Sequence, residues 1–195
     1  MKVAVIKYNA GNITSVEFAF KRIGIDVVVT DNKEDIKAAD KVIFPGVGEA
    51  SSAMTYLREK NLDKVIKELN QPVLGICLGM QLMCDHSEEG NTNCLGIFNQ
   101  HIKKFNSTEF KVPQIGWNTI YNLSSPLFKN IKENSYVYFV HGYYAELGAN
   151  TISKTNYITE YSSALNKNNF YGAQFHPEKS GDVGEQILKN FIELK

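Results

Sequence analysis

The sequence predicts an α/β fold, in which a mostly parallel central sheet carries helices on both faces and continues into an antiparallel extension. Short apolar runs of strand length, bounded by Gly, Pro or Asp, recur at residues 3–6, 25–29, 42–44 and 73–76. Between them, residues 13–23 and 50–69 place apolar side chains at three- and four-residue spacing, which is helical periodicity. Strands that alternate with helices form parallel sheets covered on both faces.

The second half of the chain has a different pattern, and it predicts the antiparallel extension. Residues 136–140 and 157–161 are rich in aromatic and β-branched side chains, and Asn, Gly and Ser separate them. A last helix is expected after Gly181. Its apolar face would be formed by Val183, Ile187, Leu188 and Ile192. No repeat or linker interrupts the chain, so residues 1–195 are expected to form one domain.

Composition narrows the class of protein. The 21 Lys and Arg residues balance the 21 Asp and Glu residues, which argues against a nucleic-acid binder. No apolar run is long enough for a transmembrane helix or for the core of a signal peptide. Three cysteines are too few for a disulfide framework, and a reducing cytoplasm is the expected setting. Cys84, His86 and Cys94 lack the paired spacing of zinc ligands, so we expect no metal site. No cofactor is expected either.

The segment 75–79, Gly-Ile-Cys-Leu-Gly, predicts a sharp strand–turn–helix connection with Cys77 at its apex. Such a turn needs small residues on both sides because its backbone is strained. The helix that follows points its amide dipoles at the sulfur, which favours the thiolate. The backbone N–H of Leu78 is then well placed to stabilise an oxyanion. The alternative is a buried structural cysteine that ends a core strand.

The segment 176–178, His-Pro-Glu, adds a base and an acid. Pro177 keeps His176 extended, and alternate residues of an extended chain face the same side. Glu178 can then hold the imidazole of His176 while that imidazole faces Cys77. An isolated pair of this kind would be interpreted as a surface histidine beside a solvated glutamate. With the elbow cysteine, it supplies the nucleophile, base and orienting acid of covalent acyl transfer.

The loop after residues 42–44 contains Gly46, Val47 and Gly48. In a parallel sheet it leaves from the same carboxyl edge as Cys77, and its two glycines let backbone amides approach a substrate closely. We interpret these residues as the second donor of an oxyanion hole, with a plain structural turn as the alternative. A dinucleotide-binding loop is disfavoured, because Ser51 occupies the place of its third glycine.

Taken together, the motifs resemble those of class I (triad) glutamine amidotransferases, whose fold is flavodoxin-like. Within that group the chain is similar to the glutaminase subunits of imidazole glycerol phosphate synthases. The similarity runs nearly end to end. It rests on the motifs at residues 8–12, 45–48, 75–82, 87–90, 116–118, 139–144 and 174–180.

The resemblance implies a reaction and a catalytic role for three residues. Cys77 would attack the carboxamide carbon of glutamine, His176 would move the proton to the leaving ammonia, and Glu178 would orient His176. A γ-glutamyl thioester would form, and water would release glutamate.

The resemblance also implies a substrate site. Gln81 and Glu89 match the positions that hold the amino-acid end of glutamine, and Gly142 and Tyr143 match the segment along the substrate. The family commonly has Ser or Thr where this chain has Gly142, so one side-chain contact to glutamine would be missing here.

A partner is implied as well, a (β/α)8 barrel cyclase that receives the ammonia for histidine biosynthesis. Asn12, Trp117 and Lys179 match positions at that interface. One alternative is a paralogue that feeds ammonia to a related barrel protein for amidine formation on a surface sugar. A catalytically idle scaffold, a cysteine peptidase or a stress protein on a similar elbow fold are further alternatives.

Overall fold

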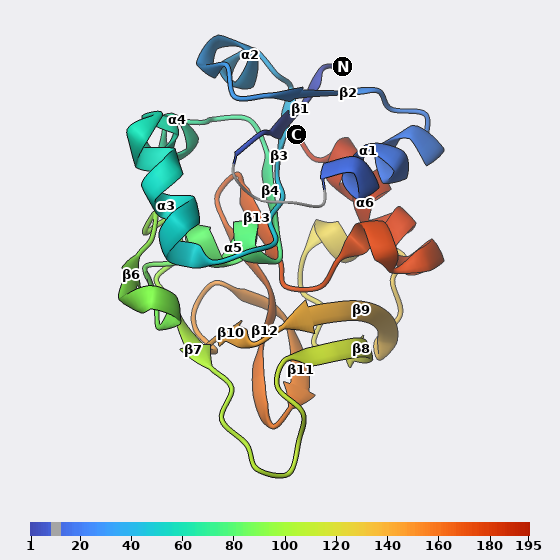
Figure 1. The fold of residues 1–195 in the computed structure, drawn as a ribbon. Helices are drawn as coiled ribbons and strands as arrows, with labels where there is room; N and C mark the ends of the chain where they lie inside the picture. The colour runs from blue at the N-terminus through green and yellow to red at the C-terminus, as the bar shows by residue number, and fades with distance from the viewer. Residues whose placement is uncertain (9–12) are drawn as a thin grey trace.

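The computed structural model describes residues 1–8 and 13–195, and its centre is a twisted sheet (Figure 1). One part of this sheet is parallel throughout, in the strand order β2-β1-β3-β4-β13. The strands of this part are β1 (Val3–Ile6), β2 (Val27–Thr30), β3 (Lys41–Phe44), β4 (Val73–Ile76) and β13 (Phe170–Ala173). The mostly parallel sheet predicted from the sequence is therefore confirmed.

Helices cover both faces of the parallel strands (Figure 1). One face carries α3 (Ala50–Glu59), α4 (Leu62–Lys67) and α5 (Leu78–Met83), and the other carries α1 (Ile13–Arg22) and α6 (Gly181–Glu193). The short α2 (Lys33–Lys37) precedes β3.

Alternation along β1 shows how this layering arises, because successive strand residues point to opposite faces. Ala4 and Ile6 belong to the core cluster that contains Met54 of α3. Val3 and Val5 belong to the cluster that contains Phe20 of α1 and Phe191 of α6. Strands buried on both faces need apolar side chains at every position, which explains the uninterrupted apolar runs in the sequence.

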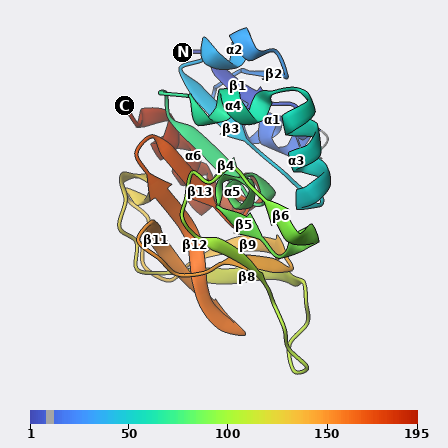
Figure 2. The same ribbon diagram turned by 90° about the vertical axis from the view of Figure 1, so that its left-hand side faces the viewer.

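The other half of the sheet is the predicted extension, and its strand pairs are antiparallel except for β5–β7. It contains β12 (Thr159–Lys167), β11 (Thr151–Tyr157), β10 (Tyr143–Ala145), β7 (His101–Lys104), β5 (His86–Ser87) and β6 (Thr92–Asn93). A separate two-stranded ribbon, β8 (Gln114–Ile120) with β9 (Ser135–His141), lies beside β11 (Figure 2). The 3₁₀ turns are η1 (Glu89–Asn91), η2 (Pro126–Phe128) and η3 (Pro177–Lys179).

Two predicted elements are wrong in their extent. The single helix expected over residues 50–69 is divided between α3 and α4, because Asn61 takes a left-handed conformation at φ 55°. The strand expected over residues 157–161 is interrupted, because Tyr157 ends β11, Ile158 forms the hairpin turn at φ 64°, and Thr159 begins β12. The last helix begins at Gly181 as predicted, and Ile187 and Leu188 are buried on its apolar face.

Across residues 1–8 and 13–195, no helix combines the length and the apolar character needed to cross a membrane.

Candidate active site

Cys77 lies at the apex of a sharp turn between β4 and α5, as the sequence predicts. Its backbone has φ 53° and ψ −111°, a conformation that costs free energy for any residue with a side chain. Glycines on both sides make the turn possible. A Cβ on Gly79 would overlap the carbonyl oxygen of Phe44, and a Cβ on Gly75 would approach Gly79 and the backbone N of Met80 at 2.8 Å. The elbow is therefore packed against the end of β3, and α5 starts directly behind the sulfur.

His176 reaches the same edge of the sheet because β13 lies beside β4. The two strands are parallel with Ala173 opposite Ile76, and the N–H of Cys77 donates to the carbonyl of Ala173 at 2.7 Å. The chain leaves β13 extended, so His176 has φ −100° and ψ 95°. A register fixed by backbone hydrogen bonds thus brings together two residues that are 99 positions apart in the sequence.

Glu178 holds the imidazole of His176. Its Oε1 lies 2.7 Å from Nδ1 of His176, and both residues are buried. The extended path expected for residues 176–178 is wrong, because Pro177 starts the 3₁₀ turn η3. The turn folds the carboxylate back onto the ring, so the predicted His–Glu contact forms by a tighter route.

The pKa of His176 is high enough for its imidazole to accept the proton of a thiol. Burial alone would lower the pKa of this imidazole, but its interactions with Cys77 and Glu178 outweigh burial and raise the pKa to about 10. A proton that leaves the sulfur is therefore accepted readily by Nε2 of His176.

A cavity of about 260 Å³ lies beside Cys77. It is lined by Cys77 and by most of the residues that the sequence assigned to substrate or oxyanion binding, namely Val47, Gly48, Leu78, Gln81, Glu89, Gly142 and Tyr143. Sequence reasoning missed Pro113, Val140 and His141, which complete the lining. The signal for Val140 and His141 was their place beside Gly142 in one motif.

Glu89 lies in this cavity with a fixed orientation. Its Oε2 accepts a hydrogen bond from the N–H of Ala50, the first residue of α3, at 2.8 Å. Burial raises the pKa of Glu89, and the bond from Ala50 works in the opposite direction. A carboxylate held in a partly buried cavity provides a binding group for an ammonium ion.

The loop of Gly46, Val47 and Gly48 contacts the elbow, but one oxyanion donor is occupied. The N–H of Leu78 donates to the carbonyl oxygen of Gly46 at 3.3 Å. The preceding carbonyl, that of Pro45, is held by the buried hydroxyl of Tyr8 at 2.6 Å. In this conformation the loop therefore presents a carbonyl group where an oxyanion would need an N–H.

The residues assigned to a partner interface are found on the surface wherever they are described. Trp117 is 55% exposed on β8 and packs edge-on against Tyr138 of β9, at 5.8 Å between ring centroids. Lys179 is exposed on η3, directly after Glu178. Asn12 lies outside the described residues. No sequence motif singled out Ile115 and Tyr136, which are the most exposed apolar residues of the β8–β9 ribbon.

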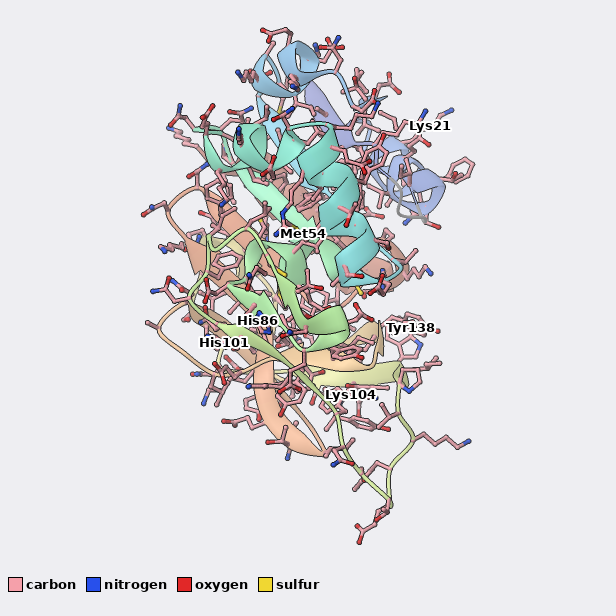
Figure 3. The ribbon with its side chains drawn as sticks, turned by 60° about the vertical axis from the view of Figure 1, so that its left-hand side comes forward. Lys21, Met54, His86, His101, Lys104 and Tyr138 are labelled. Atoms are coloured by element: carbon pink, nitrogen blue, oxygen red, sulfur yellow. The ribbon has the colours of Figure 1, made fainter. Side chains whose placement is uncertain are left out.

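His86 and His101 form a separate histidine pair. They are partners on the neighbouring strands β5 and β7, with ring centroids 6.1 Å apart, and Figure 3 shows them side by side, away from Tyr138. Among the residues that the structure describes, no group of three His, Cys, Asp or Glu side chains could hold a metal ion.

Comparisons with known proteins agree with this geometry. A family model described as "Glutamine amidotransferase class-I" matches residues 4–194. The imidazole glycerol phosphate synthase subunit HisH of Bacteroides fragilis strain YCH46 is 61% identical over 196 residues, covering all of both chains. The subunits named HisH from Bacteroides thetaiotaomicron and Idiomarina loihiensis are 56% and 45% identical, with all of this chain covered and 100% and 98% of theirs.

Solved structures support the fold at much lower identity. The crystal structure of a glutamine amidotransferase superimposes with a TM-score of 0.76 at 17% identity, covering 99% of this chain and 98% of that one. A glutamine amidotransferase from Thermotoga maritima gives a TM-score of 0.67 at 17% identity, covering 99% and 83%. With a family model over almost its whole length and full-length relatives of one name, this chain belongs to the class I glutamine amidotransferases, in the group of imidazole glycerol phosphate synthase HisH subunits.

Proposed function

We propose that this chain is the glutaminase subunit of an imidazole glycerol phosphate synthase, and that Cys77, His176 and Glu178 form its catalytic triad. The observation that carries the proposal is a strained elbow cysteine beside a histidine that a buried glutamate holds at 2.7 Å. This triad lies at a cavity lined by Gln81 and Glu89.

The reaction follows from these positions. His176 takes the proton of the Cys77 thiol, and the sulfur attacks the carboxamide carbon of glutamine. His176 then returns the proton to the leaving nitrogen, which departs as ammonia and leaves a γ-glutamyl thioester. Water, activated by the same imidazole, releases glutamate and restores the thiol. Glu89, which lines the cavity, binds the α-ammonium group of the substrate.

The ammonia passes to a partner subunit, which we propose to be a (β/α)8 barrel cyclase docked over the carboxyl edge of the sheet. Trp117 and Lys179 are exposed and suit that role. We place the complex in a reducing cytoplasm, in keeping with the free thiols of Cys77, Cys84 and Cys94. The test is genetic: the chain, expressed with its own barrel partner, should restore growth without histidine to a bacterium that lacks both subunits. Growth only with added histidine would contradict the proposal.

Gly142→Ser is expected to lower the KM for glutamine about two- to tenfold, the worth of one added hydrogen bond. Gly142 lines the cavity, and a Cβ there would meet only Pro113 and Val112, at the ordinary contact distances of 3.8 and 3.9 Å. A hydroxyl therefore has room to face the substrate. Gly142→Ala adds the same Cβ without the hydroxyl and should leave KM unchanged. Steady-state kinetics that give the two variants the same KM would rule out this contact.

Lys179→Ala is expected to raise the partner concentration needed for half-maximal glutaminase activity by roughly tenfold or more. The reason is that removing one charge of a buried interfacial pair lowers the affinity of the two subunits strongly. Lys179 is exposed, and its backbone N–H donates to the carbonyl of His176 at 3.0 Å. Partner contact at Lys179 is therefore adjacent to the triad.

The matched control for this prediction is Lys37→Ala. Lys37 is exposed at the end of α2, where its carbonyl contacts the side chain of Gln71 ahead of β4, at the amino edge of the sheet. Titration of the partner should give the same curve for Lys37→Ala and the wild type. A curve for Lys179→Ala that superimposes on both would remove Lys179 from the interface.

A further inference from the structure

Gln174 lies between β13 and His176, and its side chain points at the nucleophile. The residue is fully buried. Its Nε2 lies 3.6 Å from Sγ of Cys77, within hydrogen-bonding range for sulfur. Its Oε1 accepts a hydrogen bond from Nε2 of Gln81 at 2.8 Å. The amide of Gln174 thus joins the nucleophile to a residue that lines the substrate cavity.

The orientation of this amide follows from its neighbours. Nε2 of Gln81 also lies 3.0 Å from the backbone carbonyl oxygen of Tyr143, which can only accept hydrogen bonds. The end of Gln81 that faces Tyr143 is therefore its NH₂ group, and the second hydrogen of that group reaches Oε1 of Gln174. It follows that the NH₂ group of Gln174, and not its oxygen, faces the sulfur.

The carbonyl oxygen of Tyr143 is also held by a second side chain, that of His141. Nδ1 of His141 lies 2.7 Å from the oxygen of Tyr143, and Nε2 of His141 lies 3.2 Å from the hydroxyl of Tyr161. Burial lowers the pKa of His141 to about 4, so the ring is neutral at ordinary pH and must carry its proton on Nδ1 to donate to Tyr143. Buried and partly buried hydrogen bonds therefore run without a break from His141 to the sulfur and hold each group in place.

We propose that Gln174 is a further catalytic residue, whose Nε2–H group donates a hydrogen bond to the Cys77 sulfur and stabilises the thiolate. This inference rests on the proposed function, in which Cys77 is the nucleophile. The thiol proton passes to Nε2 of His176, and the electron pair of the S–H bond stays on sulfur. That pair then forms the bond to the carboxamide carbon. Gln174 gives up no proton in this step.

The carbonyl group of Val140, which also lies near the sulfur, cannot take this role. Sγ of Cys77 lies 3.7 Å from the carbonyl oxygen of Val140, which can accept a hydrogen bond from the thiol but can offer none to the thiolate. Ionisation therefore exchanges a weak bond to Val140 for a charge-assisted bond from Gln174. Hydrogen bonds to charged groups are the stronger class.

The test is the rate at which iodoacetamide alkylates Cys77 in the isolated full-length chain, followed over pH by mass spectrometry of the Cys77 peptide. Gln174→Met keeps the size of the side chain and removes the donor. It should slow alkylation at neutral pH by about tenfold or more, with the rise in rate displaced to higher pH. Gln174→Glu retains the shape and the acceptor for Gln81 but places a carboxylate against the sulfur. It should react more slowly still.

The matched control is Gln100→Met. Gln100 is also a buried glutamine, and its side-chain amide has no hydrogen-bond partner among the described residues. This variant should alkylate Cys77 at the wild-type rate. The partly exposed Cys94 reports the integrity of the fold in every sample, and its rate should stay constant. If Gln174→Met fails this check, Gln174→Glu still decides the question, because it can keep the hydrogen bond to Gln81.

In the complex, kcat for glutamine hydrolysis should fall in the Gln174 variants with KM nearly unchanged. Equal Cys77 alkylation profiles in folded Gln174 variants and wild type would overturn the role of Gln174 alone. Survival of glutaminase activity in Cys77→Ser would overturn the proposed function instead, so the two failures are distinguishable.

Discussion

Replacing Cys77 with serine is expected to abolish glutamine hydrolysis, with a fall in kcat on the order of 10⁶, the loss seen when a triad nucleophile is removed. The elbow places Cys77 in the lining of the cavity and in contact with His176. A serine hydroxyl fits the same strained backbone but is ionised far less readily than a thiol. The fold and partner binding should be unaffected, because the substitution replaces one buried atom by another.

The measurement is glutamate production by the complex, with and without added ammonium salts. Synthesis by the partner should persist in Cys77→Ser when free ammonia replaces glutamine, because only the source of ammonia is lost. Cys94→Ser is the control, since Cys94 is partly exposed and lies outside the cavity lining. It should retain full activity. Glutaminase activity near the wild-type level in Cys77→Ser would refute the assignment of the nucleophile.

The parallel half of the fold was predictable because its signals are local. Each strand buried on both faces needs an unbroken apolar run, and the run at residues 73–76 ends where the glycine-flanked elbow begins. Gly75 and Gly79 were informative for the same reason. Neighbouring atoms lie so close to these two positions that a Cβ would not fit, and the sequence shows this requirement directly as glycine.

The predicted element boundaries were wrong where the apolar pattern continues across a change in backbone conformation. Met54 and Leu57 of α3 pack into the same core cluster as Leu62 and Ile66 of α4, so helical periodicity runs on through Asn61. Asparagine tolerates the left-handed conformation better than most residues, but that preference is weak beside the apolar pattern. Ile158 is a harder case, because a β-branched residue is disfavoured at φ 64° and gives no turn signal.

The candidate site shows the same division between local and long-range signals. The clustering of Cys77, His176 and Glu178 could be predicted from two short motifs. The hydrogen bonds from Gln174 to Cys77 and from Gln81 to Tyr143 could not, because they join residues 97 and 62 positions apart. Their partners are set by the sheet register and by the path of the chain after β9. The occupied N–H of Leu78 depends on the conformation of one peptide unit, which no motif encodes.

The isolated chain is expected to hydrolyse glutamine slowly, because of the conformation of this peptide unit. Docking of the partner should raise the glutaminase rate by roughly 10² to 10³, the effect of one oxyanion donor. In the structure the Gly46 carbonyl accepts the N–H of Leu78. The C=O and N–H of a trans peptide point in opposite directions. Rotation of the unit between Gly46 and Val47 would therefore free Leu78 and turn the N–H of Val47 toward the oxyanion in a single movement.

Tyr8 restrains the preceding peptide unit, because its hydroxyl donates to the carbonyl of Pro45 at 2.6 Å. Val47→Pro removes the N–H that the rotation delivers, so it should keep the low basal rate and lose most of the activation. Val47→Ala keeps the N–H and should be activated like the wild type. Glutaminase rates with saturating partner would decide between them. Equal activation of both variants, or full turnover by the isolated wild-type chain, would show that the Gly46–Val47 peptide is not the switch.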